Sequence, residues 1–260
     1  MPDPSSTISR DIILSARGLT RAFQGFFAVQ GVDLDVRRGT IHALIGPNGA
    51  GKTTCFNLLT RFLPLTSGTI TFDGEDITHT APADVARRGL VRSFQISAVF
   101  PKLTVLENVR IALQRRLRGD SFDWWRSDRC LARLDDEAMQ LLQDLDLASL
   151  ADLRAVELSY GRKRALELAT TLALDPQLML LDEPMAGMGK EDIETVAEII
   201  RRAGTRRTVL MVEHNLSVVS RLSDHITVLA RGKVLADGDY ATVSSDERVI
   251  EAYLGGVAHA

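Results

Sequence analysis

The glycine-rich segment Gly46-Pro47-Asn48-Gly49-Ala50-Gly51-Lys52-Thr53 has the residue types needed to hold phosphate groups. Glycine lets the backbone wrap closely around an anion, so that several N–H groups point toward it. Lys52 can reach the terminal phosphates, and the Thr53 hydroxyl is a ligand for Mg²⁺. The spacing G-x-x-x-x-G-K-[ST] therefore predicts a nucleotide-binding loop, and we include the next residue, Thr54, among the expected nucleotide contacts.

A pair of acids, Asp182-Glu183, follows the apolar run Leu178–Leu181. Functional residues of a buried parallel strand lie at its carboxyl end, where Asp182 can hold Mg²⁺ through water and Glu183 can act as general base. Taken alone, the two acids could equally cap the next helix or face solvent. Their combination with the glycine-rich loop favours catalysis.

A third candidate site is Ser159-Tyr160-Gly161, which stands at the predicted start of a helix. A serine hydroxyl and free backbone N–H groups at a helix start make a second end that can bind an anion.

The elements that must position these residues are read from the hydrophobic pattern. The first part of the chain has short alternating segments that predict antiparallel strands, and a helical insert occupies about Thr104 to Ala155. Strands and helices alternate after residue 178, which predicts a largely parallel sheet covered on both faces. The expected elements near the sites are a strand at Ile41–Ile45, a helix at Lys52–Leu63, a hairpin at Asp73-Gly74, a helix at Asp192–Ala203, a strand at Thr208–Val212, a helix at Leu216–Leu222 and a hairpin within 225–238.

Composition excludes several other classes of protein. The chain has 260 residues and a formal net charge of −3, which argues against a nucleic-acid binder that relies on phosphate neutralisation. No apolar run approaches the roughly 20 residues that a membrane-spanning helix needs, and the N-terminus lacks the pattern of a secretory signal. Cys55 and Cys130 have neither metal-binding nor disulfide spacing, so we expect free thiols.

The segment Leu158–Arg162, LSYGR, resembles the signature of ATP-binding-cassette (ABC) proteins, usually LSGGQ and often LSYGQ in importers of hydrophobic amino acids. The resemblance covers about residues 14–255 and implies an α/β phosphate-loop NTPase of the ABC type, with a mixed sheet core, an antiparallel β subdomain and a helical subdomain. It also implies ATP and Mg²⁺ as cofactors. ATP would lie between two cassettes arranged head to tail, with Ser159 and Gly161 closing on the nucleotide of the partner cassette.

Other roles follow from the same resemblance. Phe23 falls where the family keeps an aromatic residue that stacks on adenine, although a core phenylalanine is an alternative on residue type alone. Gln95 matches the glutamine that contacts Mg²⁺ and the attacking water, and His214 matches the histidine that contacts the γ-phosphate. Lys52 and Glu183 complete the expected catalytic set.

Finer features, such as LSYG and VIEAYLG near the C-terminus, are similar to the ATPases of branched-chain amino-acid importers and their urea-importer relatives. The implied partners are membrane permease subunits and a second ABC subunit, at the inner face of the cell membrane and without nucleic acid. An export cassette of the lipopolysaccharide-transport kind and a non-transport ABC ATPase remain alternatives. A phosphate-loop kinase is disfavoured, because it would lack the signature and the histidine.

Two positions depart from the family pattern. Arg162 replaces the glutamine that ends the signature, and Gly189 stands where many cassettes have an aspartate that communicates between the two sites. For domain organisation we expect a disordered tail at 1–11, a single ABC domain at 12–255 with the helical subdomain at about 96–175, and a short tail at 256–260.

Overall fold

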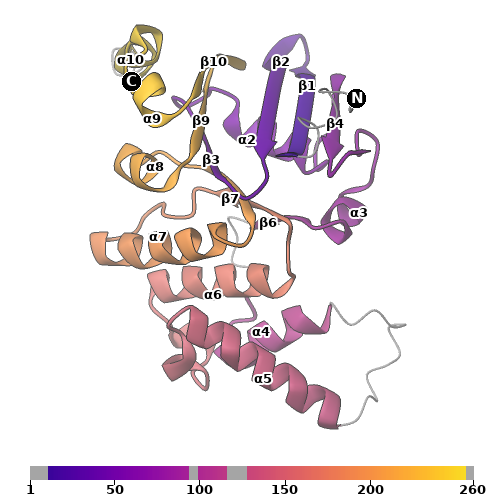
Figure 1. Cartoon of the computed structure of the whole chain (residues 1–260), viewed down its shortest axis with the longest axis vertical. Coiled ribbons are helices and arrows are strands. Elements are labelled where there is room, and N and C mark those ends of the chain that lie inside the picture. The colour runs from indigo at the N-terminus through magenta and orange to yellow at the C-terminus, as the bar shows by residue number, and fades with distance from the viewer. Residues whose placement is uncertain (1–10, 94–98, 116–127, 256–260) are drawn as a thin grey trace, which may run out of the picture. The chain divides into compact units, whose positions relative to one another are not determined.

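The computed structural model describes residues 11–93, 99–115 and 128–255, and it divides the chain into two compact units. The first, which we call the sheet unit, comprises the chain up to Arg92, Gln177–Pro184 and the chain from Arg201 onward. The second, the helical unit, comprises Ser93–Pro176 and Met185–Ile200. Figure 1 shows the elements of each unit.

The sheet unit is built around a six-stranded sheet of order β10-β9-β3-β8-β7-β6. Its strands pair in parallel from β9 through β3 and β8 to β7, whereas β10 pairs with β9 in antiparallel fashion. Every residue of β3, β7 and β8 is buried, which explains why these strands are mostly apolar, with His42, Asp182 and Thr208 as the exceptions. The bounds are β3 Ile41–Ile45, β6 Leu90–Ser93, β7 Leu178–Asp182, β8 Thr208–Val212, β9 His225–Ala230 and β10 Lys233–Gly238.

A four-stranded antiparallel sheet of order β2-β1-β4-β5 forms the other layer of strands. The predicted hairpin is confirmed, because Asp73 and Gly74 both have positive φ, 51° and 79°, between β4 and β5. Two consecutive left-handed residues give the turn whose twist matches the flanking strands. The strands are β1 Ile12–Phe23, β2 Phe26–Arg37, β4 Ser67–Phe72 and β5 Glu75–Asp76.

Helix α2, Lys52–Leu59, joins the two sheets through one hydrophobic cluster to which β1, β2, β3 and β7 also contribute. The predicted end at Leu63 is wrong, because Arg61 takes a left-handed φ of 64° and Leu63 donates its N–H to the Asn57 carbonyl. Cys55 of α2 is a free thiol, as predicted, and burial raises its pKa to about 12.

The helical unit contains the predicted helical insert. Its helices α4, α5 and α6 contact one another, and α4 begins with a capping box between Thr104 and Glu107. Its elements are α4 Val105–Gln114, α5 Asp128–Asp144, the 3₁₀ turns Ala148–Leu150 and Ala155–Glu157, α6 Tyr160–Ala173, and most of α7 Lys190–Gly204, which ends in the sheet unit.

The remaining helices belong to the sheet unit: α3 Pro82–Arg87, α8 Leu216–Leu222, α9 Tyr240–Ser244 and α10 Glu247–Gly255. The prediction for α8 is confirmed in both bounds. No helix in the described part of the chain has the length and apolar character needed to cross a bilayer.

Candidate nucleotide site

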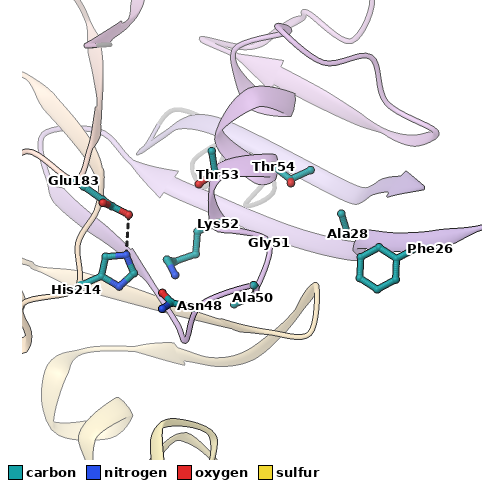
Figure 2. Close-up of a pocket in the computed structure, with 11 residues that line it drawn as sticks. Phe26, Ala28, Asn48, Ala50, Gly51, Lys52, Thr53, Thr54, Glu183 and His214 are labelled. Carbon is teal, nitrogen blue, oxygen red and sulfur yellow. Dashed lines mark hydrogen bonds and ion pairs between the residues drawn. The ribbon is translucent and has the colours of Figure 1, made fainter. Parts of the chain in front are cut away.

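The glycine-rich loop connects the end of β3 to the start of α2, as its sequence predicts. It forms one wall of a pocket in the sheet unit, and the rest is supplied by strand β2, by Glu183 after β7 and by His214 after β8 (Figure 2). The pocket is lined by Phe26, Ala28, Asn48, Gly49, Ala50, Gly51, Lys52, Thr53, Thr54, Glu183 and His214.

Two glycines of the loop are required by close backbone contacts. A Cβ at Gly46 would lie 2.1 Å from the Leu229 carbonyl oxygen, and one at Gly51 would lie 2.4 Å from the Ala28 carbonyl oxygen. Gly51 also has a φ of 100° and is the N-cap of α2, where no side chain caps the helix. The first amides of α2 therefore remain available, and together with the helix dipole they make an anion site.

Lys52 is buried and lies within the loop itself. Its ammonium group donates hydrogen bonds to the Gly46 carbonyl at 2.7 Å and to the Pro47 carbonyl at 3.0 Å. Burial lowers the pKa of Lys52, whereas the charges of Glu183 and Asp182 oppose that shift. The structure thus brings the lysine and both predicted acids into one electrostatic environment.

Glu183 and His214 come from two neighbouring strand ends and contact each other. The Glu183 carboxylate lies 2.8 Å from Nε2 of His214, and both side chains face the same pocket as Lys52 (Figure 2). Glu183 has a φ of 48°, and its N–H is held by the Val212 carbonyl of β8. A non-glycine residue in the left-handed region is uncommon and costs conformational energy, which is typical of functional positions.

Asp182 takes part in a buried network that the sequence did not predict. Arg92, at the end of β6, donates one hydrogen bond to Asp182 and another to the side-chain oxygen of Asn57 on α2. The Arg92 side chain is 10% exposed and the Asp182 side chain 0%. The predicted Mg²⁺ ligand is therefore neutralised and oriented by an arginine.

The aromatic residue at the pocket differs from the one that the resemblance indicates. Phe26 lines the pocket, whereas Phe23 does not appear among the lining residues and is 41% exposed with the Arg21 guanidinium 4.6 Å from its ring centre. Phe26 is 70% exposed, so a large apolar face is available there. The sequence places Phe23 and Phe26 on either side of the Gln24-Gly25 turn, so both aromatic residues were candidates for this position.

The signature residues lie in the helical unit and form the start of α6. Ser159 is the N-cap and its hydroxyl accepts a hydrogen bond from the Arg162 amide, as the helix-start prediction requires. A Cβ at Gly161 would lie 2.2 Å from the Asp192 carboxylate, so a larger residue there would require the Asp192 side chain to move. The side chain of Arg162, the residue that departs from the family signature, donates a hydrogen bond to the backbone carbonyl of Asp146.

The other two positions that we singled out are described only in part. Gly189 precedes α7 in open space, with no atom within 4 Å of a Cβ built there, so an aspartate would fit. Gln95 lies outside the described residues.

A last contact reaches the loop from the C-terminal helix. The pKa of Tyr253 on α10 is raised by burial, and a hydrogen bond with the Gly46 backbone opposes part of that shift. Helix α10 is thereby connected to the first glycine of the loop, a contact between residues about two hundred positions apart for which the sequence pattern gave no signal.

Comparison with known protein families gives a match over most of this architecture. The model of the ABC transporter family matches residues 29–186, which include the loop, the signature and the acidic pair. The chain belongs to the ABC transporter family. A second model, described as the branched-chain amino acid ATP-binding cassette transporter, matches residues 233–259. This ABC chain is an ATPase, and its mixed α/β sheets are those of the ABC type of phosphate-loop NTPase.

Individual relatives agree with this assignment. The chain is 38% identical over 249 residues to BraF of Pseudomonas aeruginosa, a high-affinity branched-chain amino acid transport ATP-binding protein, and covers 98% of it. It is 36% identical over 249 residues to LivG of Escherichia coli K12, which has the same description, and again covers 98%. Each alignment spans 94% of the ABC chain.

Among solved structures, the ADP conformation of MJ1267, an ATP-binding cassette of an ABC transporter, is 30% identical with a TM-score of 0.81. That likeness covers 94% of this chain and 99% of the other.

Proposed function

We propose that this ABC ATPase binds MgATP in the Figure 2 pocket and energises an importer of branched-chain amino acids or a related small solute. The observation that carries the ATPase part is the Glu183–His214 pair, which faces Lys52 across one pocket. The cargo class is supported by the match over residues 233–259 and by the relatives BraF and LivG.

The loop binds the phosphates through its backbone. The first amides of α2 and the loop N–H groups surround the β- and γ-phosphates, and Lys52 exchanges its loop carbonyls for phosphate oxygens. Asn48, Gly49 and Ala50 line the same wall and contribute backbone contacts. The positive charge that faces the phosphates therefore comes from Lys52 and from the dipole of α2.

The residues present also suit a Mg²⁺ ion. Thr53 offers a hydroxyl at the pocket, and Asp182, at the end of β7 and paired with Arg92, would hold the ion through a water molecule. Such hard oxygen donors are the ligands that Mg²⁺ prefers. The ion, when bound, neutralises charge on the β- and γ-phosphates. Gln95 is proposed as a further contact on the basis of its sequence position alone.

Hydrolysis depends on Glu183 as the general base. Its carboxylate is held by His214 at 2.8 Å, which orients it toward the pocket before a water molecule is positioned. With ATP bound, His214 would also contact the γ-phosphate, the role that the family resemblance implies for it. The two residues therefore act as a unit in which one takes the proton and the other holds the orientation.

We further propose a head-to-tail pair of cassettes docked on permease subunits at the inner face of the membrane. Ser159 and Gly161 at the start of α6 would meet the nucleotide of the partner cassette. An exposed apolar patch in the helical unit, formed by Phe100, Leu153 and Val156, supports a docking function. Backbone hydrogen bonds join its segments, including Val156 to Pro101.

The position of Phe26 makes a testable prediction about the nucleoside end of the pocket. Phe26→Ala should weaken ATP binding by about tenfold, because an aromatic stacking partner contributes roughly 1–1.5 kcal/mol. Phe23→Ala should change the affinity less, because Phe23 does not line the pocket. The measurement is the dissociation constant of a fluorescent ATP analogue for the two variants. If Phe23→Ala has the larger effect, adenine stacks at the residue that the family resemblance indicates.

The cargo is tested by uptake in cells. Deleting the gene should abolish high-affinity uptake of radiolabelled leucine, isoleucine and valine, and wild-type protein should restore it whereas Glu183→Gln should not. Uptake of an unrelated solute is the control. If the deletion leaves uptake of all three amino acids unchanged and instead alters the cell envelope, the export alternative is favoured.

A further inference from the structure

A second group of metal-ligating side chains lies at the other end of β3 from the glycine-rich loop. His42 is the second residue of β3, and the loop begins after its last residue, Ile45. The distance along the strand is about 10–13 Å. This group, His42, His225 and Asp237, belongs to the sheet unit and takes no part in the nucleotide pocket.

Strand register places the three side chains on one face of the sheet. His42 of β3 pairs directly with His225 of β9. Thr227, two residues along β9 and therefore on the same face as His225, pairs with Asp237 of β10. His42 and His225 thus lie at one level of the sheet, and Asp237 lies on the same face of the next strand, two residues further along.

The donor atoms are close enough to converge on one ion. One ring nitrogen of each histidine and one carboxylate oxygen of Asp237 all lie within 4.8 Å of one another. Tetrahedral zinc, with bonds of about 2.0–2.2 Å, separates its ligand atoms by about 3.3 Å. The required approach is available, because the side chains of His225 and Asp237 are 22% and 52% exposed and can rotate.

The hydrogen bonds of the cluster define the state of His42. The Thr227 hydroxyl donates its proton to Asp237, so it accepts from Nε2 of His42 at 2.8 Å. Nδ1 of His42 is then an unprotonated lone pair, and it is buried without a hydrogen-bond partner in the part of the chain that the structure describes.

We propose that His42, His225 and Asp237 form a binding site for a divalent transition-metal ion, with Zn²⁺ as the preferred cation. Two imidazoles and one carboxylate are a donor set suited to zinc, whereas Mg²⁺ and Ca²⁺ require oxygen ligands. A fourth position is open to water on the side of the exposed Asp237. A bound ion would join the edge strand β10 to the centre of the sheet through β9 and β3, and so stabilise the fold.

The test uses the full-length protein without an affinity tag. Zn²⁺ titrated into the wild-type protein should bind in one equivalent and raise the melting temperature, and Co²⁺ should give the visible absorption of a four-coordinate site. His225→Gln and Asp237→Asn should each weaken the affinity at least about tenfold and abolish that absorption. Both positions are partly exposed, so these variants should fold.

Two histidine variants serve as matched controls. His79 is exposed and outside the cluster, and His214 is a histidine of the sheet unit that contacts a different carboxylate, that of Glu183. His79→Gln and His214→Gln should keep the wild-type affinity and cobalt absorption. The proposal is overturned if the wild-type protein shows no metal-dependent change, if His225→Gln and Asp237→Asn bind as tightly as wild type, or if His214→Gln alone removes the absorption.

Discussion

Replacing Glu183 with glutamine is expected to slow ATP hydrolysis by about 10²–10⁴-fold, the range that general-base catalysis contributes. Glutamine keeps the size of the side chain and can still hydrogen-bond to His214, but its amide cannot accept a proton from water. The loop and Lys52 are unchanged, so MgATP should still bind. We therefore expect a complex that retains ATP and, if the cassettes pair as proposed, elutes as a dimer.

The measurement is phosphate release at saturating MgATP, together with the mass of the complex by light scattering. Glu251→Gln is a matched control, because Glu251 is an exposed residue of α10 in the same unit and the substitution removes the same charge. Its turnover should equal that of wild type. Unchanged hydrolysis in Glu183→Gln would exclude Glu183 as the base.

Replacing Arg92 with glutamine is expected to lower the free energy of unfolding by about 3–5 kcal/mol, because it leaves the buried Asp182 charge without this partner. The same substitution removes the hydrogen bond from Arg92 to Asn57 on α2. A loss of that size is a large fraction of the stability of an ordinary domain. The measurement is the urea midpoint and slope, by circular dichroism.

Arg88→Gln is the control, since Arg88 forms an ion pair with Glu75 in which the side chains are 39% and 69% exposed. Exposed pairs contribute only about 0–1 kcal/mol. Adding Asp182→Asn to Arg92→Gln should recover part of the lost stability, because the buried charge is then removed as well. Equal effects of Arg88→Gln and Arg92→Gln would show that burial does not decide the strength of the pair.

The sequence predicted those parts of the fold that depend on local pattern. β3 and β8 were apolar runs of the right length, and α8 had clear bounds. The end of α2 was missed because the left-handed turn at Arg61 carries no glycine or asparagine to mark it. The positive φ of Glu183 was invisible for the same reason.

The candidate site was predictable where residue type and spacing carry the chemistry, as in the loop, and where the family pattern supplied a role, as for His214. Contacts between distant segments were not. Arg92 meets Asp182 across ninety residues, and His42 meets His225 across one hundred and eighty-three. Only strand order and register bring such residues together, and neither is encoded in a local pattern.

The hydrogen bonds of Lys52 have a consequence for the affinity of the loop. A free lysine side chain has about 2 kcal/mol of rotamer entropy to lose when it is fixed. Here the Gly46 and Pro47 carbonyls already restrict that side chain, and Tyr253 contacts the Gly46 backbone from the C-terminal helix. That side chain is therefore ordered during folding, so the exchange of its two carbonyl partners for phosphate oxygens does not carry the entropic cost of fixing a free lysine, which corresponds to a factor of about 30 in a dissociation constant.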